Sequence, residues 1–217
     1  MPLKNPELTK FTTASQTVAS YNSTELISGQ GFITFNAYDT QVAAGQDHHI
    51  SSNAGKSKHN GTSGSGDPTA ILDVDFDTSA FNAPRVIEGI ATVSLGWGFR
   101  HDAGGAGTAD FAITLRKVSG GVETDLVTVS LAQENWSAAA TGPHHIEVMP
   151  LTIPRTQFKK GDQLRFNVLI TVGGTGGNKV PEIGHDPENG DYGLMNPTTD
   201  VTATTQLILK IPFDIDF

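Results

Sequence analysis

The sequence contains no cysteine among its 217 residues. This absence excludes disulfide bonds, thiolate zinc sites, iron–sulfur clusters and cysteine nucleophiles. The chain also lacks any uninterrupted run of about 18 apolar residues, so no membrane-spanning helix is expected. Its first residues, MPLKNPELTKF, have neither the basic head nor the apolar run of a signal peptide, and we expect none.

Positive charge is scarce as well, with 14 lysine and arginine residues against 23 aspartate and glutamate residues and a formal net charge of −9. A surface that binds nucleic acid must neutralise phosphates, so no nucleic-acid partner is expected. Glycine (24 residues) and proline (11 residues) are abundant, and no segment has a sustained apolar stripe of helical period. The composition therefore favours an all-β chain.

Alternation of apolar and polar side chains is the clearest structural signal. In Leu72–Asp77 three apolar side chains alternate with three aspartates, which predicts a strand with one buried and one solvated face. In Ala91–Phe99 the apolar side chains alternate with small ones, which predicts a strand covered on both faces. Further strands are predicted at Gly31–Val42, Ala109–Val118, Val122–Leu131, His145–Ile153, Gln163–Val172 and Val201–Phe213, with a ninth candidate at Gln16–Tyr21.

The connections between these strands indicate how they are arranged. Ser119, Gly120 and Gly121 form a short link that suits a tight hairpin. Eight or nine strands of about 8–12 residues, joined by tight turns and by longer excursions, fit two sheets packed face to face. We expect an all-β antiparallel two-sheet sandwich, with jelly-roll topology first and an immunoglobulin-like sandwich second.

Three segments have little to bury. Residues 43–68 and 173–200 are rich in glycine, proline and polar side chains and are predicted to be long loops, where a partner should be sought. Residues 1–15 contain two prolines and are expected to form an extended arm that docks on a neighbouring subunit. Residues 16–217 are expected to form a single domain.

Candidate metal ligands gather in the second of these loops. His185 and Asp186 are adjacent, and Asp191 follows in a tight turn; imidazole and carboxylate groups bind zinc, and carboxylates bind calcium. No HExxH motif occurs, and the EF-hand pattern fails because no glutamate follows Gly190 at the required place. The simpler interpretation is an ordinary turn, so no cofactor is expected, and His185, Asp186 and Asp191 are kept as metal candidates.

Patterns of catalytic residues are few. Asp73, Asp75 and Asp77 share one face of a predicted strand at a spacing of about 6.5–7 Å, so a pair of them could serve glycoside hydrolysis. A solvated sheet face is the simpler interpretation, because catalytic acids need burial or a partner to shift their pKa. The sequence has no Walker A loop and no GxSxG motif. We therefore expect a protein without catalytic residues.

Aromatic side chains suggest an alternative, a platform that stacks against sugars. The candidates are Trp97, Trp136, Tyr21, Tyr38 and Tyr192. Trp97 lies in the middle of a predicted strand and is expected in the core, whereas Trp136 follows a strand end and is expected to be exposed. Loss of glycan binding in Trp136→Ala would support this alternative.

Two segments carry a family resemblance. Gly184–Asn189 together with Thr205–Ile215 resembles the C-terminal region of small virion structural proteins of tailed bacteriophages, of the head-decoration or cement type. Ile153–Leu164 is similar to the strand entry of many jelly rolls, including viral ones. The resemblance implies a β-sandwich that assembles symmetrically on a capsid, and it carries over no catalytic residue.

These observations predict a non-enzymatic virion protein that decorates or cements the outer face of a phage capsid. Its expected partners are the major capsid protein and copies of itself, as a homotrimer or another cyclic oligomer, since many weak contacts on a lattice sum to firm attachment. A chain of net charge −9 would repel packaged DNA. We therefore expect synthesis in the host cytoplasm and a final place on the outer capsid surface. The alternatives are a carbohydrate-binding or receptor-binding module and a tail or neck component.

Overall fold

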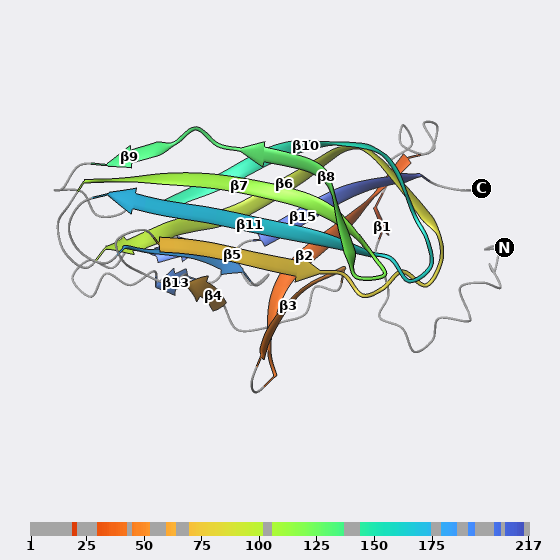
Figure 1. Ribbon diagram of the computed structural model, residues 1–217, viewed down its shortest axis with the longest axis horizontal. Coiled ribbons are helices and arrows are strands. Elements are labelled where there is room, and N and C mark those ends of the chain that lie inside the picture. The colour runs from red at the N-terminus through yellow and green to blue at the C-terminus, as the bar shows by residue number, and fades with distance from the viewer. Residues whose placement is uncertain are drawn as a thin grey trace.

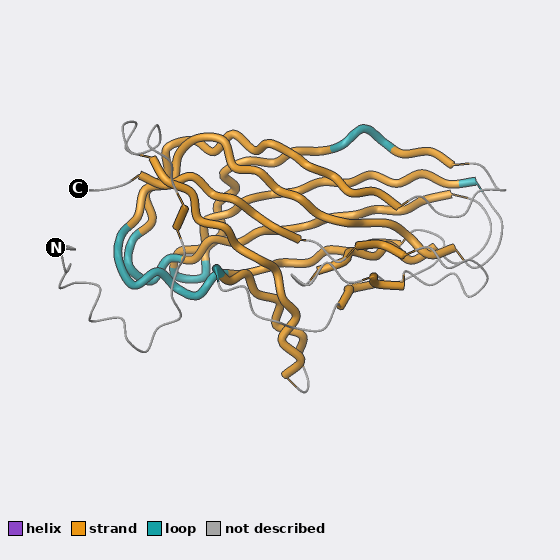
Figure 2. The backbone as a smooth tube through the Cα atoms, turned by 180° about the vertical axis from the view of Figure 1, so that it is seen from behind, coloured by secondary structure: helices purple, strands orange, loops and turns teal. Residues whose placement is uncertain are grey.

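The computed structural model describes eleven stretches of the chain, and every regular element in them is a strand (Figures 1 and 2). The stretches are residues 19–20, 30–42, 45–52, 60–63, 70–101, 106–136, 144–174, 179–185, 191–193, 202–204 and 207–214. Within them, no segment forms a helix with the length and apolar character that a membrane crossing requires.

The strands follow one another along the whole described chain. They are β1 (Ala19–Ser20), β2 (Gln30–Val42), β3 (Gly45–Ser51), β4 (Asn60–Ser63), β5 (Ala70–Asp77), β6 (Arg85–His101), β7 (Gly107–Ser119), β8 (Val122–Ser130), β9 (Glu134–Trp136), β10 (His144–Phe158), β11 (Gln163–Gly174), β12 (Lys179–His185), β13 (Asp191–Gly193), β14 (Thr202–Thr204) and β15 (Leu207–Asp214). Hydrogen bonds join 13 of them into one continuous sheet, while β13 and β14 form a separate pair.

The continuous sheet folds over into two layers. One layer has the order β5, β11, β7, β8, and the other contains β10, β6, β15, β2 and β3; Figure 1 shows β5, β11 and β7 in front of β6, β15 and β2. A parallel bridge between His49 of β3 and Asp77 of β5 joins the two layers. The other strand pairs in the described stretches are antiparallel. The all-β fold is therefore confirmed, and the two layers are consistent with the expected sandwich. The pairing is not wholly antiparallel as expected, because of the β3–β5 bridge, and the jelly-roll topology stays a prediction.

Alternate residues of the facing strands fill the space between the layers. The largest fully buried side chains are Trp97, Phe76, Phe158, Phe166, Leu95, Ile113, Leu115, Leu151, Ile153 and Leu164. Trp97 of β6 stacks on Phe111 of β7 from the opposite layer, with 5.2 Å between ring centroids and 22° between planes. Trp97 is thus a core residue, as expected, and burial of this apolar surface is the main force holding the layers together.

The predicted strands and the predicted hairpin are confirmed. Each of the eight predicted segments contains a strand, and the ninth candidate contains β1. The segment Val201–Phe213, predicted as one strand, contains two, β14 and β15, which belong to different sheets. Ser119 pairs with Val122 across a two-residue turn in which Gly120 and Gly121 have φ of +57° and +82°. These angles lie in the left-handed region, which glycine adopts without steric strain.

The two segments expected to be loops, 43–68 and 173–200, differ from the prediction because both contain strands. β3 pairs with β2 along its length, β4 pairs with β12, and β12 pairs with β6. Backbone hydrogen bonds hold these strands, so a mainly polar sequence can extend an existing ladder with few apolar side chains. Those few, Ile50 of β3 and Val180 and Ile183 of β12, are buried. The rest of these segments and the N-terminal arm at 1–15 lie outside the described residues.

Asp162 holds the turn between β10 and β11. Its carboxylate accepts a hydrogen bond of 2.7 Å from the backbone N–H of Lys159 and lies 3.0 Å from Nζ of Lys117 on β7. The N–H of Phe81 donates to the Asp162 carbonyl at 2.9 Å, which fastens the β5–β6 connection to the turn. The N–H of Lys159, the Ser119 side chain and Lys117 lower the pKa of Asp162 from 3.8 to about 2.

We expect Asp162→Asn to destabilise the protein at neutral pH and to lower its Tm by several degrees, because the amide accepts hydrogen bonds less strongly and carries no charge for Lys117. A depressed carboxyl pKa gives stability that is complete above the unfolded value of 3.8 and is lost as pH falls toward about 2. Thermal unfolding of both proteins from pH 7 to pH 2 should therefore show the difference closing below pH 4. A constant difference would contradict this role.

Candidate functional site

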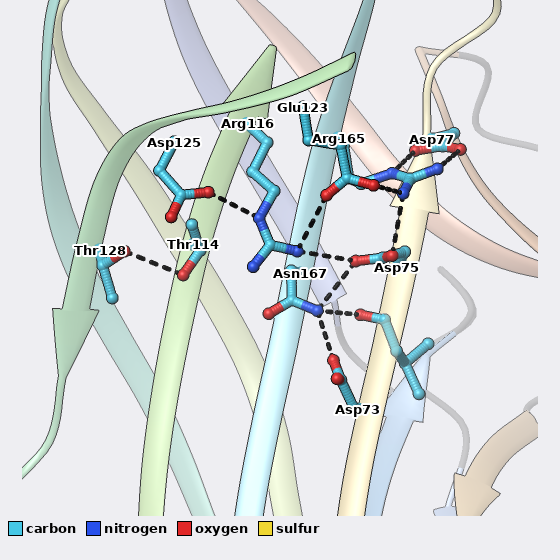
Figure 3. A network of polar contacts seen from close by, with 11 residues as sticks. Asp73, Asp75, Asp77, Thr114, Arg116, Glu123, Asp125, Thr128, Arg165 and Asn167 are labelled. Carbon is cyan, nitrogen blue, oxygen red and sulfur yellow. Dashed lines mark hydrogen bonds and ion pairs between the residues drawn. The ribbon is translucent and has the colours of Figure 1, made fainter. Parts of the chain in front are cut away.

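The outer face of the β5–β11–β7–β8 layer carries a connected network of charged side chains (Figure 3). Leu72, Val74 and Phe76 of β5 point into the core, so Asp73, Asp75 and Asp77 lie on the outside. The neighbouring strand β11 supplies their partners, because its register places Arg165 opposite Asp77 and Asn167 opposite Asp75.

Arg165 is the centre of the network. Its Nε and Nη2 donate to the two carboxylate oxygens of Asp77, both at 2.7 Å, in a bidentate pair. Its Nη1 donates to Asp75 at 3.1 Å and to Glu123 of β8 at 2.6 Å. The hydrogen bonds to Asp77 and the negative charge of Asp75 and Glu123 raise the pKa of Arg165 above its ordinary value.

Arg116 of β7 extends the network to the edge of the layer. Its Nε donates to Asp125 of β8 at 2.7 Å, while its Nη1 lies 3.5 Å from Asp75 and 3.6 Å from Glu123. Arg116 thereby links three carboxylates from two different strands. The two guanidinium groups tie together all four strands of the layer, because Arg165 contacts β5 and β8 while Arg116 contacts the same two strands from β7.

Asn167 completes the set of partners for the β5 aspartates. Its Nδ2 donates to Asp73 at 2.7 Å and to Asp75 at 2.8 Å. Asp73 is exposed, whereas Asp75 and Asp77 are half-buried beneath the arginines. The face is therefore an ordered set of ion pairs as well as a solvated surface, and its five carboxylates against two guanidinium groups leave it negatively charged.

A second group of polar side chains lies where β3, β5 and β12 meet. The ring of His185 is completely buried, 5.7 Å from the ring of His48 and 5.8 Å from that of Phe76. Beside them Tyr38 stacks on His49 with 5.2 Å between centroids. Burial, and then the proximity of His48, lower the pKa of His185 to about 3. This histidine is therefore neutral at physiological pH.

Of the three candidate metal ligands, the structure describes the side chain of one, His185. His185 lies in β12 and inside the protein, whereas the sequence places it in a loop. Asp186 and the side chain of Asp191 lie outside the described residues. Among the side chains that the structure does describe, no three histidine or acidic groups come together to hold a metal. The metal hypothesis for the turn after His185 stays a prediction.

Two aromatic residues proposed for a sugar platform are interior. Trp97 is fully buried, and Tyr38 is 7% exposed. Tyr21 and the side chains of Trp136 and Tyr192 lie outside the described residues. The exposure of Trp136 therefore stays a prediction. The buried residues Trp97 and Tyr38 cannot contribute to a sugar platform beside it.

The sequence pattern identifies the aspartates of the network but not its two arginines. Arg165 and Asn167 alternate with the buried side chains Phe166 and Val168, which is the same signal that placed Asp73 on the outer face. That signal predicts that they face outward. It does not predict which carboxylate each one meets, because this depends on strand order and register.

Comparisons with known proteins find similarity only at the level of structure. No known protein family and no curated protein matches the sequence. An aminopeptidase from the marine sediment archaeon Thaumarchaeota archaeon is 7% identical, with a TM-score of 0.49 over 83% of this chain and 36% of that one. The carbohydrate-binding module TmCBM61, in complex with β-1,4-galactotriose, is 12% identical, with a TM-score of 0.26 over 79% and 86%.

A structure of infectious bursal disease virus, Gt strain, is also 12% identical, with a TM-score of 0.28 over 87% of this chain and 37% of that one. The chain thus spans little more than a third of both the aminopeptidase and the viral protein.

We expect Arg165→Met to lower the free energy of unfolding by about 1–3 kcal/mol, because it removes a bidentate ion pair and leaves half-buried carboxylates without their cation. Arg155→Met is the matched control. Arg155 is 67% exposed and lies 3.4 Å from Glu88, so its loss should change stability by less than about 1 kcal/mol. Chemical denaturation of the three proteins in low salt measures both effects, and equal effects would contradict a special role for Arg165.

We expect the free energy of unfolding to fall with acidification by up to ~1.4 kcal/mol per pH unit from pH 6.5 toward pH 3, because unfolded His185 takes up a proton that the folded protein excludes. His185→Phe keeps an aromatic ring against Phe76 and removes this titration. The variant should therefore show a shallower pH dependence in denaturant unfolding. A parallel pH dependence in the two proteins would rule out His185 as its source.

Proposed function

We propose that this protein is a non-enzymatic structural component of a tailed-bacteriophage particle that decorates or cements the outer face of the capsid. Its partners are the major capsid protein and further copies of itself. The family resemblance of the C-terminal segments motivates the proposal, and the sandwich fold is compatible with it. The expectation of a homotrimer or another cyclic oligomer stays a prediction from the sequence.

The observation that carries the proposal is a hairpin that leaves the sandwich. Beyond the two layers β2 and β3 continue together as a two-stranded ribbon (Figures 1 and 2). The pairing of β2 with β3 runs past the buried residues Ala37 and Ile50 and continues as far as Val42 and Gly45. An isolated two-stranded hairpin is at best marginally stable in water, so contact with another protein surface would stabilise it. A ribbon of this kind suits attachment to a shell.

The charge of the outer surface supports the proposed location. The network around Arg165 leaves the β5–β11–β7–β8 face negative, and the whole chain has a net charge of −9. Such a surface repels nucleic acid and keeps neighbouring particles apart in solution. A surface that repels nucleic acid suits the outer face of a capsid better than the inner face, which lies against packaged DNA.

The test is attachment to empty phage heads built from the cognate capsid protein. In the first variant, an Asn-Gly turn replaces residues 41–46, since Thr40 and Asp47 lie opposite each other and can flank a two-residue turn. We expect the wild type to co-sediment with the heads and to raise their resistance to heat. The shortened variant should fold normally and lose at least ~10-fold in affinity, as expected when a contact worth about 1.4 kcal/mol or more is removed.

Gly120→Asn is the matched control, because it alters the two-residue turn of the other hairpin at a φ that asparagine tolerates. It should bind heads like the wild type. A wild-type protein that neither co-sediments with heads nor changes their heat resistance would refute the proposed function.

A further inference from the structure

The outer face of β6 and β10 differs in character from the charged face on the other side of the sandwich. Ile90 of β6 and Ile146 and Val148 of β10 are 59%, 57% and 64% exposed. Ala91 after Ile90 and Met149 after Val148 are buried in the core, so the alternation of the strands displays these apolar side chains on the outside. Large apolar side chains grouped on a surface commonly mark an interaction site.

The strand register gathers these side chains into one patch. Val148 of β10 lies opposite Ser94 of β6, and Ser94 lies opposite Ile208 of β15. Ile146 lies opposite Gly96, and Pro150 lies opposite Thr92. The middle strand thus contributes small side chains between the larger ones of β10 and β15. The outer patch is defined here as Ile90, Thr92, Ser94, Ile146, Val148, Pro150 and Ile208.

Charged groups lie only around the outer patch, as far as the described side chains show. Lys210 of β15 lies opposite Thr92 at one side, and Glu88 and Arg155 form an ion pair of 3.4 Å at one end. This face therefore has no excess of carboxylates, in contrast to the face around Arg165. A protein of net charge −9 repels its own copies least where carboxylates are fewest.

The free edge of β10 is unsuitable for pairing with another strand. Pro150 and Pro154 lie in β10, which pairs with β6 on one side. Proline has no N–H to donate, so within a sheet it occupies positions that point to a free edge. Both prolines lack a donor, and Pro154 lies where the β10–β6 register shifts between Ile153 and Thr156, so β10 is a poor template for a further strand. A partner that approaches the sandwich on this side is therefore better accommodated by the face of the sheet than by the edge of β10.

We propose that a second copy of the chain packs its outer patch against this outer patch, face to face. This inference rests on the self-association in the proposed function and names the surface that mediates it. Apolar side chains of both copies would leave water together, as they do between the two layers of the sandwich itself. A contact between identical surfaces is isologous and gives dimers, or larger assemblies with an even number of copies.

The experiment measures the mass of the purified full chain by sedimentation over a wide concentration range. We expect a wild-type dimer and a monomeric Val148→Asp variant, with self-association weakened ~100-fold or more because the contact would bury an unpaired carboxylate. Ile90→Asp on the neighbouring strand should act in the same way. Circular dichroism and thermal unfolding establish that the variants are folded, which is expected because the substituted side chains are exposed.

Two further variants separate burial from overall charge. Val122→Asp adds the same charge at a side chain that is 67% exposed in the β7–β8 turn, and it should leave the dimer intact. Val148→Lys reduces the net negative charge and should still dissociate the dimer, since it also buries a charge in the contact. A dimer that survives Val148→Lys would overturn the proposal.

The remaining outcomes distinguish this inference from the proposed function. A wild type that is monomeric throughout, an odd-numbered oligomer, or a dimer unchanged by Val148→Asp and Ile90→Asp would overturn the outer-patch contact. If a monomeric wild type binds heads and Val148→Asp does not, the patch docks on the shell and the inference is wrong while the function stands. A dimer that the variants dissociate but that fails to bind heads would support the contact and refute the function.

Discussion

The period of two along a β-strand is the constraint on which the rest of this molecule depends. Because each long strand buries one face between the layers, the side chains of its other face lie on the outer surface, whether they are charged or apolar. On β5 the price of burying Leu72, Val74 and Phe76 is a row of three carboxylates on the outer surface. On β10 the burial of Met149 and Leu151 places Val148 in water.

The charged outer face shows how the row of carboxylates on β5 is stabilised. Three neighbouring aspartates on one strand would repel one another in isolation. Arg165 offsets this repulsion because its planar guanidinium group meets Asp77 with two parallel hydrogen bonds and has a third donor for Asp75. Lysine would supply the charge without this geometry. In a chain with only 14 basic residues, the two arginines of this face are therefore structurally important.

The sequence alone predicts those parts of the fold that depend on local pattern. The strand Leu72–Asp77 and the hairpin at Gly120–Gly121 are confirmed because alternation and positive φ are properties of neighbouring residues. β3 and β4 were not predicted because backbone pairing, of β3 with the preceding strand β2 and of β4 with the distant strand β12, holds these polar segments in place. The ion pair of Arg165 with Asp77 joins residues far apart in the chain, and strand order cannot be obtained from either segment by itself.

His185 also shows that local sequence does not determine contacts between distant strands, since here it predicts exposure where the ring is buried. Its sequence surroundings, Gly184 before it and Asp186-Pro187 after it, are typical of an exposed turn. Its ring is buried because β12 pairs with β6 and brings it against residues of β3 and β5. Burial costs little for a neutral imidazole and much for a charged imidazolium. The burial of this one ring therefore makes the free energy of unfolding depend on pH.

The difference between the two outer faces also determines how far an assembly can grow. A face-to-face contact through the outer patch would consume the apolar surface of both copies and leave the charged faces outward, where they repel further copies. The prolines of β10 disfavour growth by strand addition at the sheet edge. A contact between identical surfaces is closed by its two-fold axis, so the outer-patch contact would favour closed assemblies over fibres. Such a limit would suit the attachment to a capsid that we propose.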